Sequence, residues 1–182
     1  MNKPLFIFVA LFMIILISAC SSSAPVEDSH EMNHSSMKHS SSGEVPDNMI
    51  ESKNPAYPAG SHATLNEGHM EGMKGAKATI VEAYDTIAYT ITYNPTNGGE
   101  KVENHKWVVQ EEIEGTKGDE VLAPGTEVTI SADHMEGMDG AAAIIESAEK
   151  TTVYMVDYTP TDGSVQVTNH KWVTEAELSK HE

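Results

Sequence analysis

The sequence predicts an all-β protein in which two tandem small SH3-like β-barrels follow a disordered N-terminal tether. The first observation is a repeat: residues 60–114 align without a gap with residues 125–179, and 25 of the 55 positions are identical. The second is that short runs of β-branched and aromatic residues alternate with turns rich in Pro, Asn and Gly. Because barrel closure removes exposed strand edges, and because each unit is short, we expect one small barrel per repeat.

The repeat divides the chain into parts of different composition. We expect a signal peptide at residues 1–19, a tether at 20–57, a first barrel repeat at 58–114, a linker at 115–124 and a second barrel repeat at 125–182. In the first repeat the pattern predicts strands at 76–83, 86–93 and 101–109, with a turn at 94–99. The second repeat follows the same course, with a strand at 151–158 and a turn at 159–164.

The N-terminus is typical of a lipoprotein leader. Lys3 precedes an apolar run at residues 5–17, which is shorter than the roughly 20 residues that a membrane-spanning helix needs. The run ends in Ile17-Ser18-Ala19-Cys20, which resembles a bacterial lipobox, and Cys20 is the only cysteine of the chain. We therefore expect lipidation of Cys20 and a location on the extracellular face of the cell membrane, with the lipid as the only membrane contact. An ordinary signal peptide with a chance cysteine is the alternative.

The tether has no periodicity and few residues to bury, which predicts disorder. It contains a dense group of candidate accessory metal ligands: His30, Met32, His34, Met37 and His39. Imidazole is a ligand for copper and zinc, and a thioether is a soft ligand that favours Cu(I). Incidental histidines in a hydrophilic linker are the alternative interpretation.

Each repeat carries a block with the sequence His-Met-Glu-Gly-Met. In the first repeat Gly68 and Gly75 flank the block, which favours a loop. The loop could bring His69, Met70 and Met73 together, as the second could His134, Met135 and Met138. One imidazole and two thioethers suit a soft ion of low coordination number such as Cu(I), whereas structural zinc prefers four Cys or His ligands. His105 and His170, each two residues before a tryptophan, are the candidate distal ligands.

Structural roles compete with ligand roles at these positions. Methionine is a common core residue, so the methionines of the two blocks could pack instead of binding metal. His105 and His170 could be hydrogen-bonded core groups. Trp107 and Trp172, like the four tyrosines of the predicted strands, are typical core aromatics, although an indole can also face a bound cation.

Composition excludes several classes of function. The chain has no arginine and a net charge of -17, which repels phosphate backbones and excludes nucleic acid as a partner. The repeats contain no cysteine nucleophile, no Gly-x-Ser-x-Gly motif and no phosphate-binding loop, so we expect no enzymatic activity. The alternative to metal binding is a cell-surface interaction module that binds wall polymer or a basic protein through a groove of Tyr and Trp residues.

The doubled block, with Gly-Ala, Tyr, Pro-Thr and Asn-His-Lys-Trp-Val after it, resembles the YdhK-type domain of Gram-positive bacteria. Two such domains behind a lipobox resemble the CopL-like copper-binding lipoproteins. The resemblance implies an extracellular, membrane-anchored protein that sequesters Cu(I) and contributes to copper resistance, with a copper-exporting transporter as a candidate partner. The metal ligands that it implies are His69, Met70, Met73, His105, His134, Met135, Met138 and His170.

Overall fold

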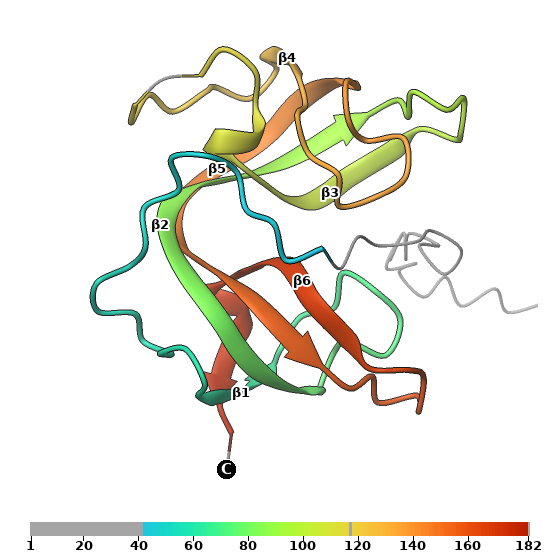
Figure 1. Ribbon diagram of the computed structural model, residues 1–182. Helices are drawn as coiled ribbons and strands as arrows, with labels where there is room; N and C mark the ends of the chain where they lie inside the picture. Colours follow the sequence, from blue (N-terminus) through green and yellow to red (C-terminus); the bar gives the residue numbers. More distant parts are fainter. Residues whose placement is uncertain (1–41, 117, 182) are drawn as a thin grey trace, which may run out of the picture. The chain divides into compact units, whose positions relative to one another are not determined.

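The computed structural model describes residues 42–116 and 118–181 (Figure 1). The leader, Cys20 and the His/Met group at residues 30–39 lie outside the described residues. Within them the regular structure consists of strands and two short 3₁₀ turns, and the predicted all-β class is confirmed. None of the described segments forms a helix with the length and apolar character needed to cross a membrane.

Seven strands and two 3₁₀ turns follow one another along the chain. They are β1 (His62–Leu65), β2 (Lys77–Tyr93), β3 (Val102–Val109), η1 (Gln110–Glu112), β4 (Glu127–Thr129), β5 (Ala142–Tyr158), β6 (Val167–Thr174), η2 (Glu175–Glu177) and β7 (Leu178–Lys180). The first repeat was expected to have separate strands at 76–83 and 86–93, but β2 is one strand of 17 residues. No Gly or Pro interrupts it, so the chain stays extended through Tyr84 and Asp85.

The pairing of β2 with β5 forms the centre of the single antiparallel sheet. The sheet has the order β4-β5-β2-β1-β7, with β3 also paired to β2 and β6 to β5. Thr86 lies opposite Thr151, its own equivalent in the second repeat. Equivalent strands that pair antiparallel at equivalent residues relate the two repeats by an approximate twofold axis. Figure 1 shows β2 and β5 passing side by side from one end of the molecule to the other.

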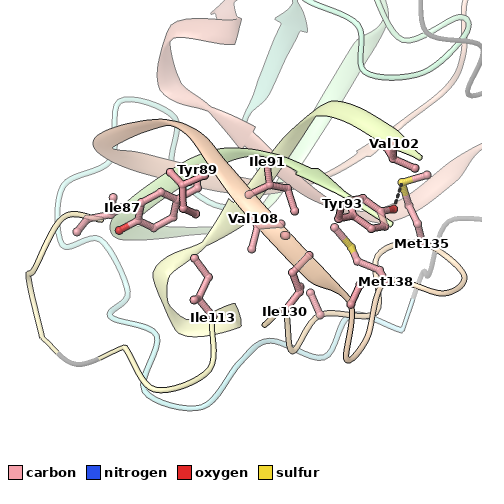
Figure 2. Packing of buried hydrophobic residues seen from close by; sticks show 14 residues of the cluster. Ile87, Tyr89, Ile91, Tyr93, Val102, Val108, Ile113, Ile130, Met135 and Met138 are labelled. Carbon is pink, nitrogen blue, oxygen red and sulfur yellow. Dashed lines mark hydrogen bonds between the residues drawn. The ribbon is translucent and has the colours of Figure 1, made fainter. Parts of the chain in front are cut away.

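The described residues form three hydrophobic clusters along this strand pair, of which two, the first and second cores, contain the methionine blocks, and each of these two combines residues of both repeats. The first core combines the second half of β2, β3 and residues 130–145 (Figure 2). The second core combines β1, the first half of β2, the end of β5 and residues Val173 and Leu178. The packing units therefore differ from the expected barrels at 58–114 and 125–182. The physical reason is that β2 and β5 are each long enough to serve both cores.

Residues 42–57, which were assigned to the disordered tether, pack on the sheet. The backbone of this segment pairs around Tyr84 with the edge of β2 that faces away from β5, with Ser52 N–H donating to the Ala83 oxygen (2.9 Å) and Asp85 N–H donating to the Ile50 oxygen (2.9 Å). The Tyr57 hydroxyl donates to the Leu178 oxygen at 3.3 Å. The tether assignment is therefore wrong for these residues, because they satisfy backbone groups of β2 that would otherwise lack partners.

The shared cores predict the behaviour of an isolated repeat. A chain of residues 58–114 has only part of each core, so we expect no folded monomer. It should fold only as a dimer in which a second copy of β2 takes the place of β5. Size-exclusion chromatography with light scattering would report the mass, and the melting temperature should rise with protein concentration. A folded monomer with a concentration-independent melt would contradict the shared cores.

The packing of residues 42–57 predicts the effect of a substitution at Tyr57. Its ring contacts Tyr154 edge to face, with ring centroids 5.9 Å apart. Tyr57→Ala removes both this contact and the hydrogen bond, and it should lower the free energy of unfolding by about 2 kcal/mol. Tyr57→Phe, which keeps the ring, should lose about 1 kcal/mol or less. Denaturant unfolding measures both variants, and an unchanged stability in Tyr57→Ala would mean that the segment does not pack.

Candidate metal centre

The His-Met-Glu-Gly-Met blocks form tight loops, as predicted, immediately before β2 and β5. In the first loop Met73 N–H donates to the Met70 oxygen at 3.2 Å, and in the second Met138 N–H donates to the Met135 oxygen at the same distance. The glycine of each block is required. Gly72 has a φ of +71°, and a Cβ there would lie 2.9 Å from Pro160. Each loop therefore docks on a turn of the other repeat.

The first donor group comprises His69, Met70, Met73 and His170. The rings of His69 and His170 have centroids 6.1 Å apart. Tyr158 contacts the ring of His170 at a centroid distance of 5.7 Å, and its hydroxyl donates to the Met70 sulfur at 3.5 Å. The fold thus gathers two imidazoles and two thioethers at the end of the second core.

The second donor group is the equivalent set of His134, Met135, Met138 and His105. The rings of His134 and His105 have centroids 6.5 Å apart. The Tyr93 hydroxyl donates to the Met135 sulfur at 3.8 Å, and Figure 2 shows this contact beside Met138. Burial raises the pKa of Tyr93 and of Tyr158 to about 12, so each hydroxyl keeps its proton and remains a donor to sulfur at neutral pH.

The distal histidines are exchanged between the repeats. Sequence order groups His105 with the block at 69–73 and His170 with the block at 134–138. In the structure His170 lies beside His69, and His105 lies beside His134. The exchange follows from the shared cores, because each block packs with the β3 or β6 strand of the other repeat.

The methionines are also core residues. Met73 and Met138 are fully buried and belong to the second and first cores, respectively, while Met70 is partly buried. The structural alternative for these side chains is therefore correct as a description of their packing. The Met73 sulfur also accepts the backbone N–H of His69 at 3.4 Å, which holds the thioether beside the backbone of His69.

Two buried glutamates that sequence reasoning missed are in contact with the block histidines. Glu177 Oε1 lies 2.8 Å from His69 Nε2, and Glu112 Oε1 lies 2.5 Å from His134 Nε2. The side chains of both glutamates are at most 6% exposed. The sequence did contain a signal for these glutamates, because they occupy equivalent positions in the two repeats and follow the Asn-His-Lys-Trp-Val motif at the same distance.

The tryptophans bind the same carboxylates. Trp107 Nε1 donates to Glu177 at 2.7 Å, and Trp172 Nε1 donates to Glu112 at 3.1 Å. Both indoles are buried, which agrees with the expected core role. Each glutamate therefore forms hydrogen bonds with a histidine and a tryptophan of the other repeat.

The carboxylate of Glu177 is ionised. Burial by itself raises the pKa of this group, but the hydrogen bond of His69, with further bonds from Thr174 and Trp107, lowers it. A negative charge is thereby held against the imidazole, at a side-chain exposure of only 6%.

The donors fit a soft ion better than a hard one. Among the described residues no group of three or more His, Cys, Asp or Glu side chains is placed to hold a metal. Each candidate set instead depends on two thioethers and two imidazoles, which suits Cu(I). The Nδ1 atoms of His69 and His134 are buried and have no hydrogen-bond partner within the described part of the chain, so each is a nitrogen donor not engaged elsewhere.

Comparison with known proteins identifies the repeat unit. Residues 59–110 and 124–175 match the family described as "Protein of unknown function (DUF1541)". The chain is 53% identical over 175 residues to the protein described as "Uncharacterized protein YdhK" of Bacillus subtilis strain 168, covering 93% of this chain and 85% of YdhK.

Solved structures agree with this relation and with the predicted resemblance to the YdhK-type domain. A crystal structure of the DUF1541 family protein YdhK from B. subtilis is 58% identical, covers 81% of this chain and 100% of its own, and has a TM-score of 0.77. The solution structure of the YdhK C-terminal domain is 60% identical, covers 67% and 92%, and has a TM-score of 0.63. The chain therefore belongs to the DUF1541 family, and its two tandem family domains are the two repeats.

Proposed function

We propose that this protein is an extracellular, membrane-anchored lipoprotein that sequesters Cu(I) and contributes to copper resistance. The observation that carries the proposal is the duplicated donor group, in which two thioethers and two imidazoles converge although they come from different repeats. Convergence of soft donors from distant parts of the sequence is what a Cu(I) site requires.

The environment of the donors suits sequestration rather than turnover. Met73, Met135 and Met138 are at most 2% exposed, and His134 is equally buried. A bound ion would be screened from water and from soluble oxidants, and its release would require the loop to open. Two equivalent sites increase capacity, whereas catalysis needs only one centre; we therefore propose no enzymatic activity.

Anchoring and delivery complete the proposal. The lipobox-like leader supports attachment through Cys20, and the His/Met group at residues 30–39 supports additional, weaker Cu(I) binding between the membrane and the folded part. A copper-exporting transporter in the same membrane would be a recipient or a source of the ion.

The alternative of a wall-binding module loses its main support. It needs an exposed groove of Tyr and Trp, but Tyr89, Tyr93, Tyr154 and Tyr158 are at most 1% exposed and the tryptophans are buried. We do not propose it.

The thioether site predicts the result of replacing the methionines of one block. Leucine matches methionine in volume, and such a core exchange usually costs less than about 1.5 kcal/mol. Met70→Leu with Met73→Leu should keep the fold but abolish tight Cu(I) binding at the first donor group only. Anaerobic competition with a chromophoric Cu(I) chelator measures capacity, and thermal melting measures the fold. Full capacity in the double variant would refute the proposed function.

The exchange of distal histidines gives a second prediction. In the double-leucine variant, adding His170→Ala should not reduce the Cu(I) capacity further, because this residue belongs to the site already removed. Adding His105→Ala should weaken the remaining site, because His105 lies beside His134. The same chelator competition distinguishes the two triple variants, and thermal melts verify that both are folded. The reverse result would mean that each site is formed within one repeat.

A further inference from the structure

We infer that Glu177 and Glu112 are positioning residues that keep the proton of His69 and His134 on Nε2, so that Nδ1 is the atom that binds Cu(I). This inference rests on the proposed function and adds to it the ligating atom and the group that selects it. The carboxylates themselves would not touch the ion.

The geometry of Glu177 determines where its hydrogen bonds go. One oxygen, Oε2, accepts three bonds, from Trp107 Nε1 (2.7 Å), from the Thr174 backbone N–H (2.9 Å) and from the Thr174 hydroxyl (3.0 Å). The other oxygen, Oε1, faces His69 Nε2 at 2.8 Å. An ionised carboxylate only accepts hydrogen bonds, so Nε2 must be the donor.

The other ring nitrogen, Nδ1, then has the free lone pair. His69 Nδ1 is buried and has no hydrogen-bond partner among the described residues. With its proton on Nε2, the ring keeps the lone pair of Nδ1, which is therefore able to bind a metal. A carboxylate that orients a ligating histidine in this way also increases its basicity.

The second site has a similar arrangement with one donor fewer, because Val109 stands where the first site has Thr174 with its hydroxyl. Glu112 Oε2 accepts the Val109 backbone N–H at 3.0 Å and Trp172 Nε1 at 3.1 Å, while Oε1 faces His134 Nε2 and lies 3.2 Å from Trp172 Nε1. His134 Nδ1 is also buried without a hydrogen-bond partner within the described chain. Since the two networks are built from equivalent residues, the second site serves as an internal reference for a change in the first.

Glu177→Gln tests the inference with little change in shape. The amide has one accepting atom, and three donors converge on the Oε2 position, so the amide oxygen should take that position and the NH₂ group should face His69. His69 Nε2 must then accept a hydrogen bond, which moves the ring proton to Nδ1. Cu(I) affinity at the first site should fall roughly 10–100-fold, with the second site unchanged.

Long-range ¹H–¹⁵N NMR correlations of the histidine rings give a readout that needs no metal. In the metal-free wild-type protein, Nε2 of His69 should carry the proton and Nδ1 should not; Glu177→Gln should reverse this. The matched control is Glu175→Gln, which removes the same charge from the same turn and keeps an amide oxygen to accept the Tyr154 hydroxyl (3.1 Å). Neither the tautomer of His69 nor the Cu(I) affinity should change in this control.

The outcomes separate the inference from the proposed function. A proton on Nδ1 of His69 in the metal-free wild-type protein would overturn the role given to Glu177, even if Cu(I) binds tightly. Unchanged Cu(I) affinity in Glu177→Gln with a reversed tautomer would overturn Nδ1 as the ligating atom. Absence of tight Cu(I) binding to the wild-type protein would refute the proposed function instead, while the expected tautomers would still support the positioning role of the glutamates.

Discussion

The antiparallel pairing of β2 with β5 is the constraint on which the rest of the structure depends. Each strand has 17 residues, and the pair extends from Ala78 opposite Tyr158 to Tyr93 opposite Ala143. A strand of this length passes through both cores, so neither repeat can close a core by itself. The exchange of loops, distal histidines and tryptophans between the repeats follows from this one pairing.

Buried carboxylates connect that architecture to the candidate metal sites. A buried carboxylate is tolerated only where several donors surround it, and Glu177 and Glu112 meet this condition with a backbone N–H, an indole and an imidazole each. Glu112 lies in η1 of the first repeat and Glu177 in η2 of the second, and the indole and imidazole partners of each glutamate come from the other repeat. Loss of one partner would leave a buried charge poorly satisfied, which ties the position of each imidazole to the integrity of the fold.

In the proposed function the methionines serve two purposes, packing and metal binding. Met73 and Met138 fill the cores, yet their loops also place thioethers beside histidines, and in each loop the first methionine accepts a tyrosine hydroxyl. Packing and metal binding are compatible here because a thioether is apolar enough for a core and still has a lone pair for a soft ion. Sites formed from core residues are rigid, which favours retention of an ion over rapid exchange.

The sequence by itself determined the all-β class, the 65-residue repeat, the loop conformation of the His-Met-Glu-Gly-Met blocks and the burial of Trp107 and Trp172. These properties depend on local composition and on periodicity, which are visible in each repeat alone. Only the tertiary structure decided which parts of the two repeats share a core and that residues 42–57 pack on β2. It also decided that His170 lies beside His69, and that Glu177 and Glu112 contact His69 and His134. Two repeats with identical donor residues offer each ligand two chemically equivalent partners, one within the repeat and one in the other copy. The local sequence around the donors does not distinguish these two partners, so the length and register of the β2–β5 pair decide between them.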